Sequence, residues 1–135
     1  MRRARPFSRP KQSEDALHRA VADHLTLVLG PDVVWFHPPN GGARSKREGA
    51  KFKAQGVKAG VADIVLVYQG RHYEIELKSA TSKQSDSQIA WQAALEKAGG
   101  QYRLAKSVDD VKMALREFGI PTREIIYEWQ SPRDN

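Results

Sequence analysis

The chain has 135 residues, 40% of them hydrophobic, which is enough apolar material for the core of one domain but not of two. Its formal net charge of +6 favours a polyanionic partner such as nucleic acid, although ribosomal proteins and inert basic domains share this balance. The sequence has no cysteine, which excludes a disulfide scaffold and a thiolate metal site and fits a reducing cytosol. No apolar run approaches the roughly 18 residues of a membrane-spanning helix.

Residues 1–12 hold five Lys or Arg and two Pro without periodicity, which predicts a disordered basic arm. The arm lacks the apolar segment of a secretory signal. Ser13 is a suitable cap for a helix that runs to about residue 29, where Gly30-Pro31 ends it. The predicted apolar stripe of this helix is Leu17, Val21, Leu25 and Val28.

The next segments alternate between short strands and loops. Residues 33–37 form a predicted strand that Pro38-Pro39 stops, and a glycine-punctuated basic stretch follows, with one helical turn or more over 46–55. From residue 63 onward the sequence predicts a β-hairpin that turns near Gln69-Gly70.

Helix and strand alternate again in the last third of the chain. Ser85 begins a predicted helix that ends at Gly99-Gly100, residues 101–106 form a strand, and Ser107 caps a helix closed by Gly119. The segment 122–130 is apolar enough for a final strand or an intersubunit contact. The order α-β-β-β-α-β-α predicts a small α/β domain over 13–120, followed by a C-terminal strand or tail over 121–135.

The predicted hairpin carries charged residues on one of its faces. Side chains alternate with period two, so Glu74, Glu76 and Lys78 lie opposite an apolar face in the second strand. A turn at 69–70 brings Asp63, at the start of the first strand, close to Glu76 and Lys78.

Two neighbouring carboxylates repel each other when ionised, which favours a cation between them. Mg²⁺ takes one or two carboxylates and leaves positions for a phosphate oxygen, and it can activate an attacking water. Lys78 could orient that water or balance charge on the phosphorane. Two alternatives stay open from these residues: a solvated strand face for the E-x-K, and a turn residue with its own backbone hydrogen bond for Asp63.

An Asp at the start of one strand and E-x-K on its antiparallel neighbour resembles the PD-(D/E)XK nuclease superfamily. The ordered blocks "FHPPNGGARSKREGAKFKAQGVKAGVADIVLV", "EIELK" and "SDSQIAWQAALEKAGG" are similar to the VRR-NUC (virus-type replication-repair nuclease) family, over about residues 14–118. The chain closely resembles the small stand-alone versions found in phages and bacteria, rather than the domain fused to large eukaryotic repair nucleases. The resemblance implies a restriction-endonuclease-like core, with a central mixed β-sheet flanked by helices.

The resemblance also implies site residues and a cofactor, Mg²⁺ or Mn²⁺. The implied metal ligands are Glu14, Asp63, Glu76 and the carbonyl of Leu77. The implied catalytic residues are Asp63, Glu76, Lys78 and Gln88. The family usually has Pro before the motif aspartate, where this chain has Ala62, and we expect activity to survive this change.

Each carried-over position also has a structural alternative. An acid such as Glu14 is favoured by the dipole of a first helical turn, but it is in phase with the apolar stripe, which predicts that it faces inward. Gln88 completes an S-x-x-Q capping box with Ser85. We expect Trp91 to belong to the core, and His37 to make either a structural hydrogen bond or a substrate contact.

The basic stretch before Asp63 predicts phosphate contacts, with a mobile solvated loop as the alternative. Its predicted DNA-binding residues are Asn40, Arg44, Lys46, Arg47, Lys51, Lys53 and Lys58. The resemblance implies a homodimeric endonuclease that cleaves branched DNA such as a four-way junction, leaves a 5′-phosphate and works in the cytoplasm of a bacterium or phage-infected cell. Trp35, Phe36 and "IIYEW" could build the dimer or fill the core. The alternatives are a non-catalytic DNA-binding module, a restriction-like nuclease or exonuclease, and a ribosomal or structural protein.

Overall fold

The structure is a computed structural model that describes residues 13–39 and 46–123. Along these ranges the helices and strands are α1 (Glu14–Val28), β1 (Val34–Phe36), α2 (Lys46–Ala54), β2 (Ile64–Tyr68), β3 (Arg71–Leu77), α3 (Asp86–Lys97), β4 (Gln101–Ala105) and α4 (Val108–Phe118). Each predicted helix and strand in these ranges is present, and α2 extends the expected helical turn to nine residues. The predicted arm over 1–12 and the segment 124–135 lie outside the described residues.

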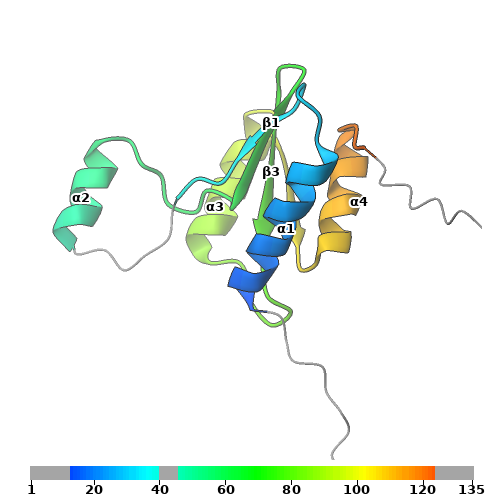
Figure 1. The fold of residues 1–135 in the computed structure, drawn as a ribbon. Helices are drawn as coiled ribbons and strands as arrows, with labels where there is room; N and C mark the ends of the chain where they lie inside the picture. Colours follow the sequence, from blue (N-terminus) through cyan, green and yellow to red (C-terminus); the bar gives the residue numbers. More distant parts are fainter. Residues whose placement is uncertain (1–12, 40–45, 124–135) are drawn as a thin grey trace, which may run out of the picture.

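The four strands form one mixed sheet in the order β1-β2-β3-β4. β1 and β3 both pair antiparallel with β2, while β4 pairs parallel with β3 after the crossover through α3. Figure 1 shows α1 and α4 together on one side of this sheet and α3 on the other. The predicted α/β fold with a central mixed sheet flanked by helices is therefore confirmed.

The register places most of the core side chains of β2 and β3 on one face of the sheet. Ile64 pairs with Ile75 and Leu66 with Tyr73, so these side chains share the face that α1 and α4 cover. The stripe predicted for α1 packs on them, and the ring of Tyr73 lies 4.7 Å from that of Phe118 in α4.

Local signals define the ends of these elements. Ser13, Ser85 and Ser107 cap α1, α3 and α4, each accepting a hydrogen bond from a backbone N–H of the first turn. Gln69 and Gly70 have φ of 48° and 74°, as the two central residues of a type I′ hairpin turn require. This turn fixes the register that carries Asp63 to the far end of β3.

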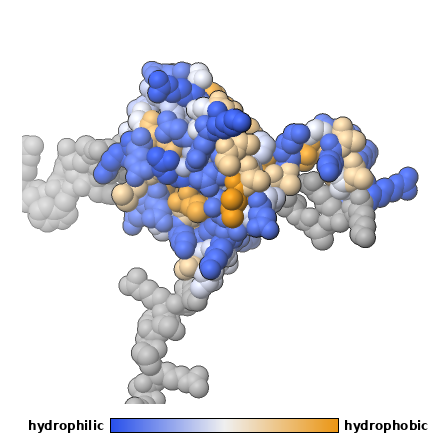
Figure 2. Space-filling view, turned by 180° about the vertical axis from the view of Figure 1, so that it is seen from behind, coloured by the Kyte–Doolittle hydropathy of each residue, from blue (hydrophilic) through white to orange (hydrophobic). Residues whose placement is uncertain are grey.

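The face of the sheet toward α3 is only partly covered. α3 has no buried residue, and several large apolar side chains that the register places on this face are exposed: Val34, Phe36, Val67 and Leu104. Figure 2 shows the molecule from behind, with hydrophobic residues grouped among hydrophilic ones and with α2 apart from the main body. None of the helices in the described part of the chain is long and apolar enough to span a membrane.

Candidate active site

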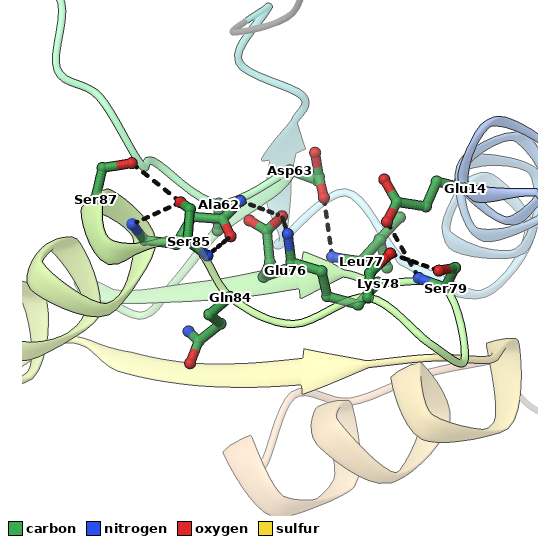
Figure 3. A network of polar contacts seen from close by, with 12 residues as sticks. Glu14, Ala62, Asp63, Glu76, Leu77, Lys78, Ser79, Gln84, Ser85 and Ser87 are labelled. Atoms are coloured by element: carbon green, nitrogen blue, oxygen red, sulfur yellow. Dashed lines mark hydrogen bonds and ion pairs between the residues drawn. The ribbon is translucent and has the colours of Figure 1, made fainter.

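A pocket of about 440 Å³ opens where α1, the start of β2, the end of β3 and the start of α3 meet. Its lining includes every chemically active residue predicted for the site: Glu14, Asp63, Glu76, Leu77, Lys78 and Gln88. They come from four separate segments of the sequence, which the hairpin register and the two helix N-termini bring together. Figure 3 shows Glu14, Asp63 and the run Glu76–Lys78.

Asp63 is held at the entrance to β2 by the strand beside it. Its Oδ2 accepts a hydrogen bond of 2.9 Å from the backbone N–H of Leu77, which places Asp63 at the end of β3, where the hairpin turn is expected to bring it. The N–H of Lys78 points the other way, to the carbonyl of Ala105 on β4. Because N–H and C=O of one residue point toward the same neighbouring strand in an antiparallel ladder, the Leu77 carbonyl faces the Asp63 side of the sheet.

Glu76 is the most constrained acid of the site. Its side chain is 4% exposed, and its Oε2 is buried without a hydrogen-bond partner among the described residues. Burial, the charge of the nearby Asp63 carboxylate and a hydrogen bond that a protonated Glu76 can make to Asp63 raise the pKa of Glu76 to about 8, against the opposing effect of Lys78. The solvated-face alternative for this E-x-K is therefore wrong, because Glu76 and Glu74 are both buried.

Lys78 and Gln88 approach the other oxygen of Glu76. Lys78 Nζ lies 3.8 Å from Glu76 Oε1, and the lysine side chain is only 11% exposed. Gln88 Nε2 donates a 3.1 Å hydrogen bond to the same Oε1, while Gln88 Oε1 accepts one of 2.9 Å from the Ser85 backbone. The capping and active-site roles considered for Gln88 are therefore compatible, since each uses a different atom of the amide.

Glu14 reaches the pocket from the first turn of α1, but it is exposed, so the prediction that it faces inward is wrong. Its Oε1 accepts a 3.3 Å hydrogen bond from the backbone N–H of Ser79, just past the end of β3. Glu14 lies on the same face of α1 as the apolar stripe. At the first turn of α1, however, β3 has already ended, so the Glu14 side chain meets solvent instead of the core.

Glu74 is a buried acid that the sequence analysis did not assign to the site. Its oxygens accept hydrogen bonds from Trp91 Nε1 at 2.8 Å and from the Ala62 backbone at 3.3 Å, and His72 Nε2 lies at 2.6 Å. Trp91 is half-buried outside the apolar core, so its prediction as a core residue is wrong. The VRR-NUC pattern usually has proline in place of Ala62. Proline has no backbone N–H and could not donate this hydrogen bond to Glu74.

The loop before Asp63 docks closely on α3. Gly60 has φ of 83°, and a Cβ added there would lie 2.2 Å from the carbonyl oxygen of Ser87. Only glycine combines this conformation with this approach. The contact fixes Asp63 relative to the first turn of α3, which carries Gln88.

Two histidines also reach the pocket, and only one of them was considered from the sequence. His37 follows β1, and its Nδ1 lies 2.6 Å from the carbonyl oxygen of Asp63, so the structural hydrogen bond expected for it is present. His18, one turn after Glu14 in α1, packs edge-on against His37 with 4.1 Å between ring centroids. No local motif marked His18.

The predicted DNA-binding residues are only partly described. Asn40, Arg44 and the side chain of Lys46 lie outside the described residues. The remaining four are exposed: Arg47, Lys51 and Lys53 on α2, and Lys58 in the loop that leads to Asp63. Within the described part of the chain α2 contacts no other helix or strand, and Figure 1 shows it standing away from the sheet.

The residues of the pocket fit a hard divalent cation. Carboxylate and carbonyl oxygens are the ligands that Mg²⁺ and Mn²⁺ prefer, and Asp63, Glu76, Glu14 and the Leu77 carbonyl supply such oxygens. The unpartnered Oε2 of Glu76 needs a cation or a proton, since a buried carboxylate without either is unstable.

Comparison with known proteins adds one result about the fold. No family model matches the sequence, and no curated protein matches it. A solved structure described as "VRR_NUC domain protein" superposes with a TM-score of 0.64 at 24% sequence identity, covering 80% of this chain and 89% of that chain. The chain therefore has the fold of that VRR_NUC domain protein.

Proposed function

We propose that this chain is a nuclease of the VRR-NUC family that hydrolyses phosphodiester bonds of DNA with Mg²⁺ or Mn²⁺. The observation that carries the proposal is the buried, unpartnered Oε2 of Glu76, beside Asp63 and across from Lys78. Such an arrangement costs stability, which is the expected cost of a site built to hold a cation. The fold of the VRR_NUC domain protein and the resemblance of the sequence blocks support the same conclusion.

Each residue has a defined task in this proposal. The Leu77 N–H and the Gln88 amide orient Asp63 and Glu76. A bound divalent cation would polarise the scissile phosphoryl group and lower the pKa of the attacking water. Lys78 orients that water or balances the charge that develops on the phosphorane. The exposed lysines and the arginine of α2 hold the DNA backbone.

The test of catalysis is cleavage of end-labelled DNA with Mg²⁺, Mn²⁺ or EDTA. Wild type should cut with either metal ion and not with EDTA, and Lys78→Ala should lose cleavage while Lys97→Ala, an exposed lysine at the end of α3, should retain it. If wild type binds DNA but cuts no substrate with either ion, the non-catalytic DNA-binding module replaces this proposal.

The proposed substrate is branched DNA, attacked by a homodimer. A domain of this size offers little surface for a long duplex, and the exposed Phe36, the last residue of the short edge strand β1, supplies apolar area for pairing. The dimer should be identified by light scattering of the eluted protein. The fractions that contain it should cut four-way junctions of unrelated sequence in preference to flaps and linear duplexes. One preferred site on linear duplex would support a restriction-like enzyme instead.

A further inference from the structure

His18, His37 and Asp63 form a compact group at the edge of the pocket. One ring nitrogen from each histidine and one carboxylate oxygen of Asp63 lie within 4.8 Å of one another. The three residues come from three different elements: α1, the segment after β1, and the entrance to β2. Their convergence is therefore a property of the tertiary fold.

A hydrogen bond fixes the proton on His37. A carbonyl oxygen only accepts hydrogen bonds, so the 2.6 Å contact with the Asp63 carbonyl requires a proton on Nδ1 of His37. In the neutral ring this leaves the lone pair on Nε2. A histidine that ligates a metal ion commonly donates its other ring N–H to a backbone carbonyl, which sets the tautomer and the ring orientation.

We propose that His18, His37 and Asp63 bind a first-row transition-metal dication, such as Co²⁺ or Zn²⁺, at a site distinct from the oxygen-ligand site of Glu76. Imidazole nitrogen favours these ions, whereas Mg²⁺ prefers oxygen ligands. Three protein ligands leave coordination positions open, as in sites where a metal ion meets a substrate or water rather than in closed structural sites.

This inference deepens the proposed function, because Asp63 belongs to both ligand sets. Two metal ions that share one carboxylate can together bind the attacking and the leaving oxygens of a phosphodiester. Binding of an ion by the two histidines nevertheless does not require that the chain cleave DNA, so the two proposals fail independently.

The test is Co²⁺ binding in excess Mg²⁺. Isothermal titration calorimetry measures the affinity and stoichiometry, and the visible absorption of the bound ion reports its coordination. Mg²⁺ occupies the oxygen-ligand site, so wild type should bind one Co²⁺ per chain. His18→Gln and His37→Gln should each weaken this binding by at least about tenfold. His24→Gln is the matched control, because His24 lies on the same helix outside the pocket, and it should bind as wild type does.

A measurement on wild type alone complements these variants. X-ray absorption of the Zn²⁺-loaded chain in excess Mg²⁺ should show scattering from two imidazole rings. Lys78→Ala should bind Co²⁺ as wild type does, which would separate this site from cleavage. Unchanged Co²⁺ binding in both histidine variants, no Co²⁺ binding by wild type in Mg²⁺, or a Zn²⁺ spectrum without imidazole would each overturn the proposal.

Discussion

Glu76 links the electrostatics of the site to the stability of the chain. Its pKa is raised from the ordinary value of 4.5 to about 8, first by burial and then by the Asp63 carboxylate. Between these two pH values the folded chain retains a proton that the unfolded chain has lost. Stability without metal ions therefore falls as pH rises through this window, and it is unaffected by Glu76 below it.

Glu76→Gln removes the group whose raised pKa makes the stability fall with pH. In EDTA, the variant and wild type should unfold at similar urea concentrations near the lower end of the window, and the variant should become the more stable of the two as pH approaches about 8. Urea unfolding followed across pH measures the difference, with the exposed Glu96→Gln on α3 as the control. A constant difference across this pH range would show that Glu76 is ionised in the metal-free fold.

Gln88 permits a separation of its two roles. Gln88→Ala loses both the capping contact and the hydrogen bond to Glu76, whereas Ser85→Ala loses the Ser85 Oγ acceptor and leaves the Gln88 amide on Glu76. Each variant should cost about 1 kcal/mol of unfolding free energy. Cleavage by Gln88→Ala should fall well below that of Ser85→Ala, and equal rates would leave Gln88 with a capping role alone.

At the scale of elements, the loop before β2 positions the site through its contact with α3. Gly60→Ala combines a left-handed backbone with a clash against the Ser87 carbonyl, while Gly70→Ala has a left-handed backbone, φ of 74°, in open space. Both should cost about 1–2 kcal/mol for conformation. Gly60→Ala should lose more stability and also cleavage, because Asp63 moves with the loop. Thermal unfolding and initial rates compare the pair, and equal losses in both variants would contradict the proposed docking.

The elements were largely predictable because their signals are local. The serine caps, the Gln69-Gly70 turn and the period-two alternation of the hairpin each lie within a few residues of the structure that they determine. The proximity of Asp63 to Glu76 followed from the turn and the alternation of the hairpin. The position of Lys78, one residue past β3, followed from its spacing to Glu76.

The parts that were missed depend on distant contacts. Glu74 became recognisable only when the fold brought Trp91 and the Ala62 backbone to it, and His18 only when β1 placed His37 beside α1. The inward direction predicted for Glu14 failed because periodicity defines the face of a helix but not how far the sheet extends along it.

At the scale of the molecule, the exposed cations of α2 lie apart from the pocket. The polar pocket lies at one end of the sheet. The exposed cations of α2 lie on a helix that stands away from the sheet and contacts no other described element. A basic helix that contacts no other described element is suited to follow a DNA backbone in the proposed nuclease, since phosphate contacts position a duplex without selecting its sequence.

The contribution of α2 is measurable through salt. The double variant Lys51→Ala/Lys53→Ala should weaken DNA binding and lower the slope of log affinity against log salt by about 0.9 for each duplex phosphate that the variant no longer neutralises. Fluorescence anisotropy over a salt series measures this slope. Lys97→Ala/Lys112→Ala, which removes the same charge from α3 and α4, should leave it unchanged, and equal effects of the two pairs would assign the binding to net charge.

The most direct measurement is the rate at which a labelled four-way junction is cut in Mg²⁺ by wild type, Glu76→Gln and Glu96→Gln. Glu76→Gln preserves the size of a buried side chain, removes its capacity for negative charge and replaces one acceptor oxygen with an NH₂ group. The cleavage rate of this variant should fall by at least about 100-fold. Loss of a carboxylate that would hold the cation should reduce activity at least as much as loss of a group that only orients such a ligand. Glu96→Gln should cut as wild type does. Cleavage by Glu76→Gln at the wild-type rate would contradict the assignment of this pocket as a metal-dependent nuclease site.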